Sequence, residues 1–186
     1  VSEMDTVIGK QGEKKRLLTI IMRRYSLLLI FLLDDGRAST VHNVFNRLEH
    51  RLGLDTFRAL FPVILTDNGS EFSNPKEIEY SHLTGEQRTK VFYCEPGRSD
   101  QKGSCEVNHE MIRRILEKKT SFDNLTQEDI NLMMSHINSY KRKKLNNSSA
   151  LEMFNLMYGN DIATKLNILE INSNDINLTP SLLKRN

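Results

Sequence analysis

The sequence contains no tryptophan, only two cysteines and four prolines, and no long apolar run. Cys94 and Cys105 have neither a zinc-finger spacing nor the number needed for a disulfide framework, so we expect a reducing setting and two inert thiols. The longest apolar run, residues 27–33, is far shorter than the roughly 20 residues of a membrane-spanning helix. Lys and Arg exceed Asp and Glu so little that the net charge is +2, and overall charge does not identify a nucleic-acid binder.

The composition is that of a globular protein. The 186 residues are 38% hydrophobic and 27% charged, which suits one domain with extensions. The chain begins at Val1 and enters patterned sequence almost at once, without a signal peptide. We therefore expect an excised fragment whose N-terminal part is missing.

The pattern along the chain predicts an α/β protein. Residues 3–9, 16–24 and 27–33 are predicted strands that form an antiparallel meander. Next come a helix from Ser39 or Thr40 to about residue 52, a strand ending before Asp67, a helix from residue 75 to about 82, and a strand at 90–94. A long helix at about 104–118 and helices capped by Thr126 and by Ser148 or Ser149 follow. Residues 160–186 are predicted to be a partly ordered tail that packs on the body.

The most informative stretch is residues 65–72, Leu-Thr-Asp-Asn-Gly-Ser-Glu-Phe. A short apolar run precedes it, and the Asn-Gly pair then breaks the strand. Asp67 is thus held at the end of a buried strand, which is a suitable mount for a divalent cation. An Asp-Asn-Gly turn without any ligand is the alternative.

Three acids occupy comparable places: Asp5 on the first strand, Asp67 after the fourth, and Glu106 at the start of the long helix. If the first and fourth strands are neighbours in a mixed sheet, Asp5 and Asp67 converge, and a helix crossing that edge brings Glu106 to them. Such carboxylates could hold two Mg²⁺ ions for phosphodiester chemistry. Glu3 is the rival of Asp5, and Glu110 is the rival of Glu106.

Other acids have simpler interpretations. Glu71 is predicted to cap or solvate the turn after Asp67, and Asp34 and Asp35 to form a turn at the end of a strand.

Three segments carry a resemblance to a known family: residues 3–10 (Glu-Met-Asp-Thr-Val-Ile-Gly-Lys), 66–72 (Thr-Asp-Asn-Gly-Ser-Glu-Phe) and 101–108 (Gln-Lys-Gly-Ser-Cys-Glu-Val-Asn). They resemble the acid-bearing motifs of bacterial DDE transposases of the insertion-sequence-thirty-like family, within the retroviral-integrase superfamily. Residues 120–129, 137–145 and 152–154 resemble that family as well, so the match covers residues 3–158 in order. Asp100, Cys105 and Val107 depart from the residues usual at their places.

The resemblance implies an RNase H-like fold, a five-stranded mixed sheet flanked by helices, with a catalytic core at 1–158 and a C-terminal extension at 159–186. It implies that Asp5, Asp67 and Glu106 bind Mg²⁺ or Mn²⁺, two ions, and that the enzyme cleaves DNA and transfers the strand. The implied partners are transposon ends and target DNA, with a homodimer or higher oligomer as the working complex and no membrane. The implied location is the bacterial cytoplasm, with nucleoid association when bound to DNA, and an N-terminal helix-turn-helix region would be missing.

Several polar residues are candidates for DNA contact, although a polar helix face or a solvated basic run would explain them equally well. They are Lys102, Asn108, Arg113, Lys141, Arg142 and Lys143. Two rival functions remain beside the transposase core. One is an RNase H-like nuclease, and the other is a catalytically silent DNA-binding or oligomerisation module.

Overall fold

The computed structural model describes residues 1–95 and 103–184 of the chain. A five-stranded mixed sheet with strand order β3-β2-β1-β4-β5 forms its centre. The strands are β1 (Ser2–Ile8), β2 (Arg16–Met22), β3 (Leu27–Leu33), β4 (Ile64–Thr66) and β5 (Val91–Tyr93). The expected meander of the first three strands is confirmed, and β4 lies beside β1 in parallel orientation, as the convergence of Asp5 and Asp67 requires.

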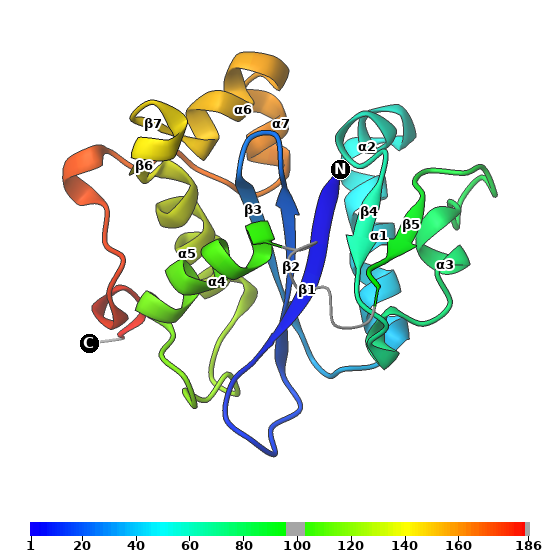
Figure 1. The fold of residues 1–186 in the computed structure, drawn as a ribbon, viewed down its shortest axis with the longest axis horizontal. Coiled ribbons are helices and arrows are strands. Elements are labelled where there is room, and N and C mark those ends of the chain that lie inside the picture. The colour runs from blue at the N-terminus through cyan, green and yellow to red at the C-terminus, as the bar shows by residue number, and fades with distance from the viewer. Residues whose placement is uncertain (96–102, 185–186) are drawn as a thin grey trace.

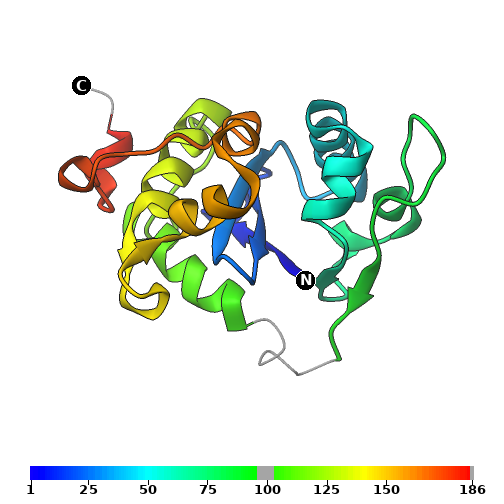
Figure 2. The same cartoon turned by 90° about the horizontal axis from the view of Figure 1, so that it is seen from above.

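Helices cover both faces of the sheet (Figure 1). On one side lie α1 (Ala38–Leu52) and α2 (Leu54–Leu60), and on the other lie α4 (Gly103–Ile115), α5 (Gln127–Ser139) and α6 (Ala150–Tyr158). The view from above shows the sheet between these two layers (Figure 2). Because β2 and β3 are covered on both sides, nearly all of their residues are apolar and buried.

Local sequence signals explain several helix boundaries. Thr126 and Ser149 each form a capping box with the acid three residues on, Asp129 and Glu152, as their sequence positions predict. Gly53 adopts φ +81° and separates α1 from α2, a helix that the sequence pattern did not reveal.

Two predicted helices are shorter than expected. Helix α3 (Lys76–Glu79) ends early because Tyr80 turns extended and pairs with Gln87. Helix α4 ends at Ile115 rather than near residue 118.

A buried ion pair joins α1 to the segment that connects α3 and β5. The Arg88 guanidinium donates to Glu49 Oε2 at 2.6 Å and to the carbonyl oxygens of Ile78 and Glu77. The Ser81 hydroxyl donates to the other Glu49 oxygen at 2.5 Å. Since Arg88 and Glu49 are almost fully buried, these bonds replace the water that both charges have lost.

The C-terminal segment lies along α5. Helix α7 (Asn160–Lys165) follows α6, and the chain then passes the 3₁₀ turns η4 (Ser173–Asp175) and η5 (Pro180–Leu183). Backbone N–H groups of Leu169 and Ile171 donate to the hydroxyls of Ser135 and Ser139, and the N–H of Asn177 donates to His136 Nδ1 at 3.1 Å. Polar groups on α5 therefore hold this segment in place.

Within the described residues, no helix is both long and apolar enough to cross a membrane.

Glu49→Gln should lower the free energy of unfolding by about 3 kcal/mol, because it leaves the buried Arg88 guanidinium uncompensated. Denaturant unfolding measures this change. The matched control is Glu86→Gln, which breaks an exposed ion pair with Arg58 and should cost less than about 1 kcal/mol. Equal losses in the two variants would contradict a stabilising role for the buried pair.

Acidification should loosen the C-terminal segment. Burial lowers the pKa of His136 below its ordinary value of 6.5, while the nearby Asp175 partly opposes the shift. Neutral His136 accepts the N–H of Asn177, so its contribution is complete above pH 6.5 and is lost as the pH falls through the lowered pKa. The protection factor of the Asn177 amide in hydrogen exchange, compared at pH about 7.5 and about 5, measures the effect. His136→Gln does not titrate and should abolish the pH dependence; an unchanged dependence in this variant would assign it to another group.

Candidate active site

Asp5 and Asp67 lie on neighbouring strands at the same level. The parallel register pairs Glu3 with Leu65, and continuing it by two residues places Asp5 opposite Asp67. The Thr66 hydroxyl donates to the Met4 carbonyl at 3.2 Å, which joins the two strands just before these acids. Both acids are half-buried, so part of each residue is packed against the protein and part is exposed to solvent. The arrangement agrees with the predicted convergence.

Helix α4 packs across β1 and β2, and its first turn is attached to β1 by a buried acid. Glu3 is 1% exposed, and its Oε2 accepts the N–H of Cys105 at 2.8 Å. Its Oε1 accepts the Arg23 guanidinium. A carboxylate at the N-terminus of a helix satisfies a backbone donor that has no partner within the helix and interacts favourably with the helix dipole. Both Glu3 oxygens are therefore used: Oε2 positions α4 against β1, and Oε1 binds Arg23 after β2.

Glu106 follows Cys105 in the first turn of α4 and is exposed, as is its rival Glu110. Among residues 1–95 and 103–184, one group of three potential ligand atoms lies within 4.8 Å of one another, and its members are Asp5, Cys105 and His109. Asp67 and Glu106 are outside that group. The use of Glu106 as the third carboxylate ligand stays a prediction.

Two hydrogen bonds hold the turn that follows Asp67. Asp67 Oδ1 accepts the N–H of Gly69 at 3.0 Å, which closes a local Asx turn. Glu71 Oε1 accepts the hydroxyl of Thr6, the residue after Asp5, at 2.7 Å. A Cβ on Gly69 would lie 2.6 Å from Glu71 Oε2 and 3.1 Å from Asp67 Oδ1, so a side chain there would displace these carboxylates. Glu71 thus connects this turn to β1, which is more than the capping role predicted for it.

Two residues expected to contact DNA are instead interior. Asn108 is 0% exposed; its amide donates to the Ser104 carbonyl, and its Oδ1 accepts Arg142 at 3.1 Å. Arg142 also donates to the carbonyl oxygens of Ser26 and Ile137, and burial lowers its pKa to about 10, which still leaves it charged at neutral pH. Because both side chains bind protein groups away from solvent, this burial contradicts their predicted contact with phosphates.

The other DNA-contact candidates differ in accessibility. Lys141 and Lys143 are exposed, and Lys141 forms a 3.7 Å ion pair with Glu152. Arg113 is half-buried, donates to the Ile8 carbonyl at 2.9 Å, and has its pKa lowered by burial. Lys102 lies outside the described residues. The two lysines are therefore the described candidates best placed to meet a polyanion.

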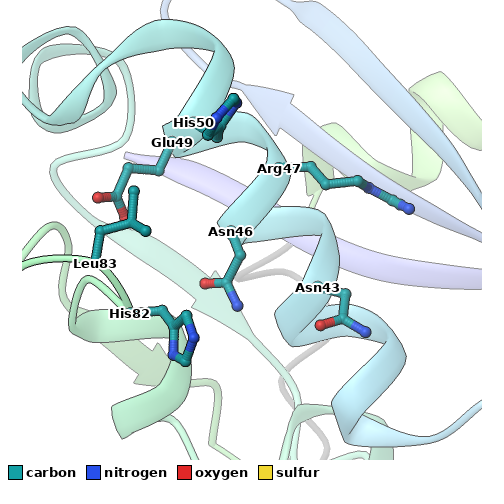
Figure 3. A pocket seen from close by; sticks show the side chains of 7 residues that line it. All are labelled: Asn43, Asn46, Arg47, Glu49, His50, His82 and Leu83. Atoms are coloured by element: carbon teal, nitrogen blue, oxygen red, sulfur yellow. The ribbon is translucent and has the colours of Figure 1, made fainter.

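A separate pocket of about 370 Å³ opens between α1 and the segment after α3 (Figure 3). None of the predicted site residues lines it. Its lining side chains are Asn43, Asn46, Arg47, Glu49, His50, His82 and Leu83. The pocket is therefore distinct from the carboxylate site.

Sequence reasoning did not reveal the hydrogen bonds that Glu3, Glu71 and His109 make in and around the site. The alternation of β1 did place Glu3 on the same face as Asp5, which was the available signal for its proximity. The partners of Glu71 and His109 lie on distant strands, Thr6 and Thr19 respectively, and no local pattern predicts such pairs.

Several relatives in sequence are transposases of insertion sequence elements. The chain is 29% identical over 152 residues to the transposase for IS4351 of Bacteroides fragilis, which covers 82% of this chain and 43% of that protein. It is 32% identical over 79 residues to transposase InsI for IS30A of Escherichia coli K12, covering 42% of this chain and 19% of that protein. The chain thus spans less than half the length of these relatives. No known family model matches the sequence.

Similar solved structures include retroviral integrases. The HTLV-2 integrase catalytic core domain, in complex with magnesium and in trimeric form, superposes with TM-score 0.57 at 16% identity, covering 82% of this chain and 93% of that chain. A chain of the simian T-cell lymphotropic virus intasome, in complex with PP2A regulatory subunit B56 gamma, gives TM-score 0.62 at 15% identity, covering 82% and 52%. The protein therefore has the RNase H-like fold of integrase catalytic cores and is similar in sequence to the transposases of insertion sequence elements.

Proposed function

We propose that this chain is the catalytic core of a bacterial insertion-sequence transposase, which cleaves DNA and joins the freed 3′-end to target DNA in a reaction that depends on divalent metal ions. The observation that carries the proposal is the side-by-side placement of Asp5 and Asp67 on adjacent parallel strands, within an integrase fold. Several sequence relatives are named transposases, which supports strand transfer over simple hydrolysis.

The carboxylates present fit Mg²⁺ or Mn²⁺. Both ions prefer oxygen ligands, and Asp5 and Asp67 offer half-buried carboxylates on rigid strands, with Glu106 exposed on the adjoining helix turn. Two bound ions would activate the attacking hydroxyl and stabilise the leaving oxygen of the phosphodiester. The magnesium named for the HTLV-2 core supports the choice of metal.

Other residues would position the metal ligands or contact DNA. Glu3 holds the first turn of α4 beside β1, and Glu71 with Gly69 holds the turn that carries Asp67. Lys141 and Lys143 would meet phosphates, with transposon ends and target DNA as the partners. We propose an oligomeric working complex in the bacterial cytoplasm; the intasome and the trimeric form named for the structural neighbours support assembly into oligomers.

Asp67→Asn should reduce strand transfer by at least about 100-fold, because it removes a charged ligand while keeping the turn geometry. The assay follows a labelled, pre-cut DNA end into supercoiled plasmid with Mg²⁺ or Mn²⁺. Asp55→Asn, the same change at a fully exposed residue of α2, is the control and should leave the rate unchanged. Plasmid nicking without joined products would indicate the nuclease. No metal-dependent product from the unaltered chain would overturn the proposal in favour of the silent module.

Gly69→Ala should raise the Mn²⁺ concentration needed for half-maximal strand transfer by roughly 10-fold, since the new Cβ displaces the carboxylates of Glu71 and Asp67. Metal titration of the reaction measures this shift. Gly103→Ala is the matched control, because its added Cβ meets no atom within 4 Å. If both variants respond alike, the close packing around Gly69 does not position the site.

A further inference from the structure

A second set of ligand atoms adjoins the carboxylate site and has a different chemistry. Asp5 of β1 and Cys105 and His109 of α4 each present one ligand atom, and these atoms lie within 4.8 Å of one another. Cys105 and His109 are four residues apart, so they occupy the same face of α4, one turn from each other. Cys105 is 1% exposed, whereas Asp5 and His109 are half-buried. The set thus has a buried sulfur and two groups that reach the surface.

Thr19 orients the imidazole. Thr19 is the residue of β2 directly opposite Asp5, and its hydroxyl donates to the Asp5 carbonyl at 3.2 Å. The same hydroxyl oxygen lies 2.9 Å from His109 Nε2. Because a hydroxyl has one proton to donate and this one donates to Asp5, the Thr19 oxygen is available to accept an N–H from Nε2, which would fix the orientation of the ring. A fixed acceptor for the second ring N–H is the usual arrangement around histidine ligands.

The helix that carries two of these ligands is held in place before any ion binds. The N–H of Cys105 is bonded to buried Glu3, two residues before Asp5 on the same strand. Tetrahedral zinc coordination needs ligand atoms about 3.5 Å apart, so side chains already within 4.8 Å need to move by only about 1 Å. Rotations of the side chains can supply that movement without shifting the backbone.

The donor set selects the kind of metal. A thiolate, an imidazole and a carboxylate suit zinc and similar thiophilic ions, whereas Mg²⁺ takes oxygen ligands. Three protein ligands leave a fourth position for water. We propose that Asp5, Cys105 and His109 form a site for Zn²⁺ or a chemically similar ion, and that its occupation withdraws Asp5 from the Mg²⁺ site and inhibits strand transfer. The binding stands by itself; the inhibition rests on the proposed function.

Co²⁺ titration of the 186-residue chain, with a phosphine reductant present, tests the binding directly. A thiolate-to-cobalt charge-transfer band should appear in the unaltered chain and disappear when Zn²⁺ is added. It should be absent in Cys105→Ser and retained in Cys94→Ser, the matched change at the other buried cysteine. His109→Gln and Thr19→Val should each weaken Co²⁺ binding by about 10-fold or more. Circular dichroism confirms that each variant is folded.

The possible outcomes separate this inference from the proposed function. No band in the unaltered chain, or an equal band in folded Cys105→Ser, overturns the metal site whatever the enzymatic activity. If the band responds to the variants as expected but the unaltered chain shows no strand transfer, the result supports the metal site and counts against the proposed function. Where both are present, Zn²⁺ should inhibit the unaltered chain at concentrations that leave Cys105→Ser active, and equal inhibition of both would overturn the competition for Asp5.

Discussion

The buried carboxylate of Glu3 is the constraint on which the candidate site depends. It joins three parts of the chain: β1, which contains it, Arg23 after β2, and the Cys105 N–H in the first turn of α4. Glu3 is 1% exposed, and burying a carboxylate is costly unless its oxygens accept hydrogen bonds. These bonds form only when α4 lies in this position relative to the sheet, so Glu3 favours this packing. That position places the thiol of Cys105 beside Asp5. Local helix or strand propensity alone would not determine it.

The sheet and its carboxylates were largely predictable because their signals are local. Apolar runs, the Asn-Gly turn after Asp67 and the capping residues Thr126 and Ser149 each reveal an element within a few residues. The neighbouring positions of β1 and β4 then follow from the family resemblance, and the register brings Asp5 level with Asp67. Helix α2 escaped prediction because it directly continues α1 after Gly53, with no polar linker to separate two helices.

The errors concern polar residues whose partners are remote in sequence. Asn108 and Arg142 are 34 positions apart and were both assigned to DNA contact, because an Asn on a helix and an Arg in a basic run are ordinarily at the surface. The structure buries them against each other and against backbone carbonyls of the β2–β3 turn and α5. Sequence alone shows charge and local spacing, whereas such a buried network is defined by which elements pack together.

The proximity of a hard and a soft ligand set gives Asp5 two competing uses. With Asp67 and Glu106 it would complete an all-oxygen environment, in which Mg²⁺ binds weakly until substrate phosphate adds further ligands. With Cys105 and His109 it completes a set that holds thiophilic ions without substrate. A Zn²⁺ ion bound to Asp5 would occupy one of its oxygens, and its positive charge would repel a Mg²⁺ ion at the other. Cys105, a departure from the family pattern, is therefore the residue through which metal identity would control this active site.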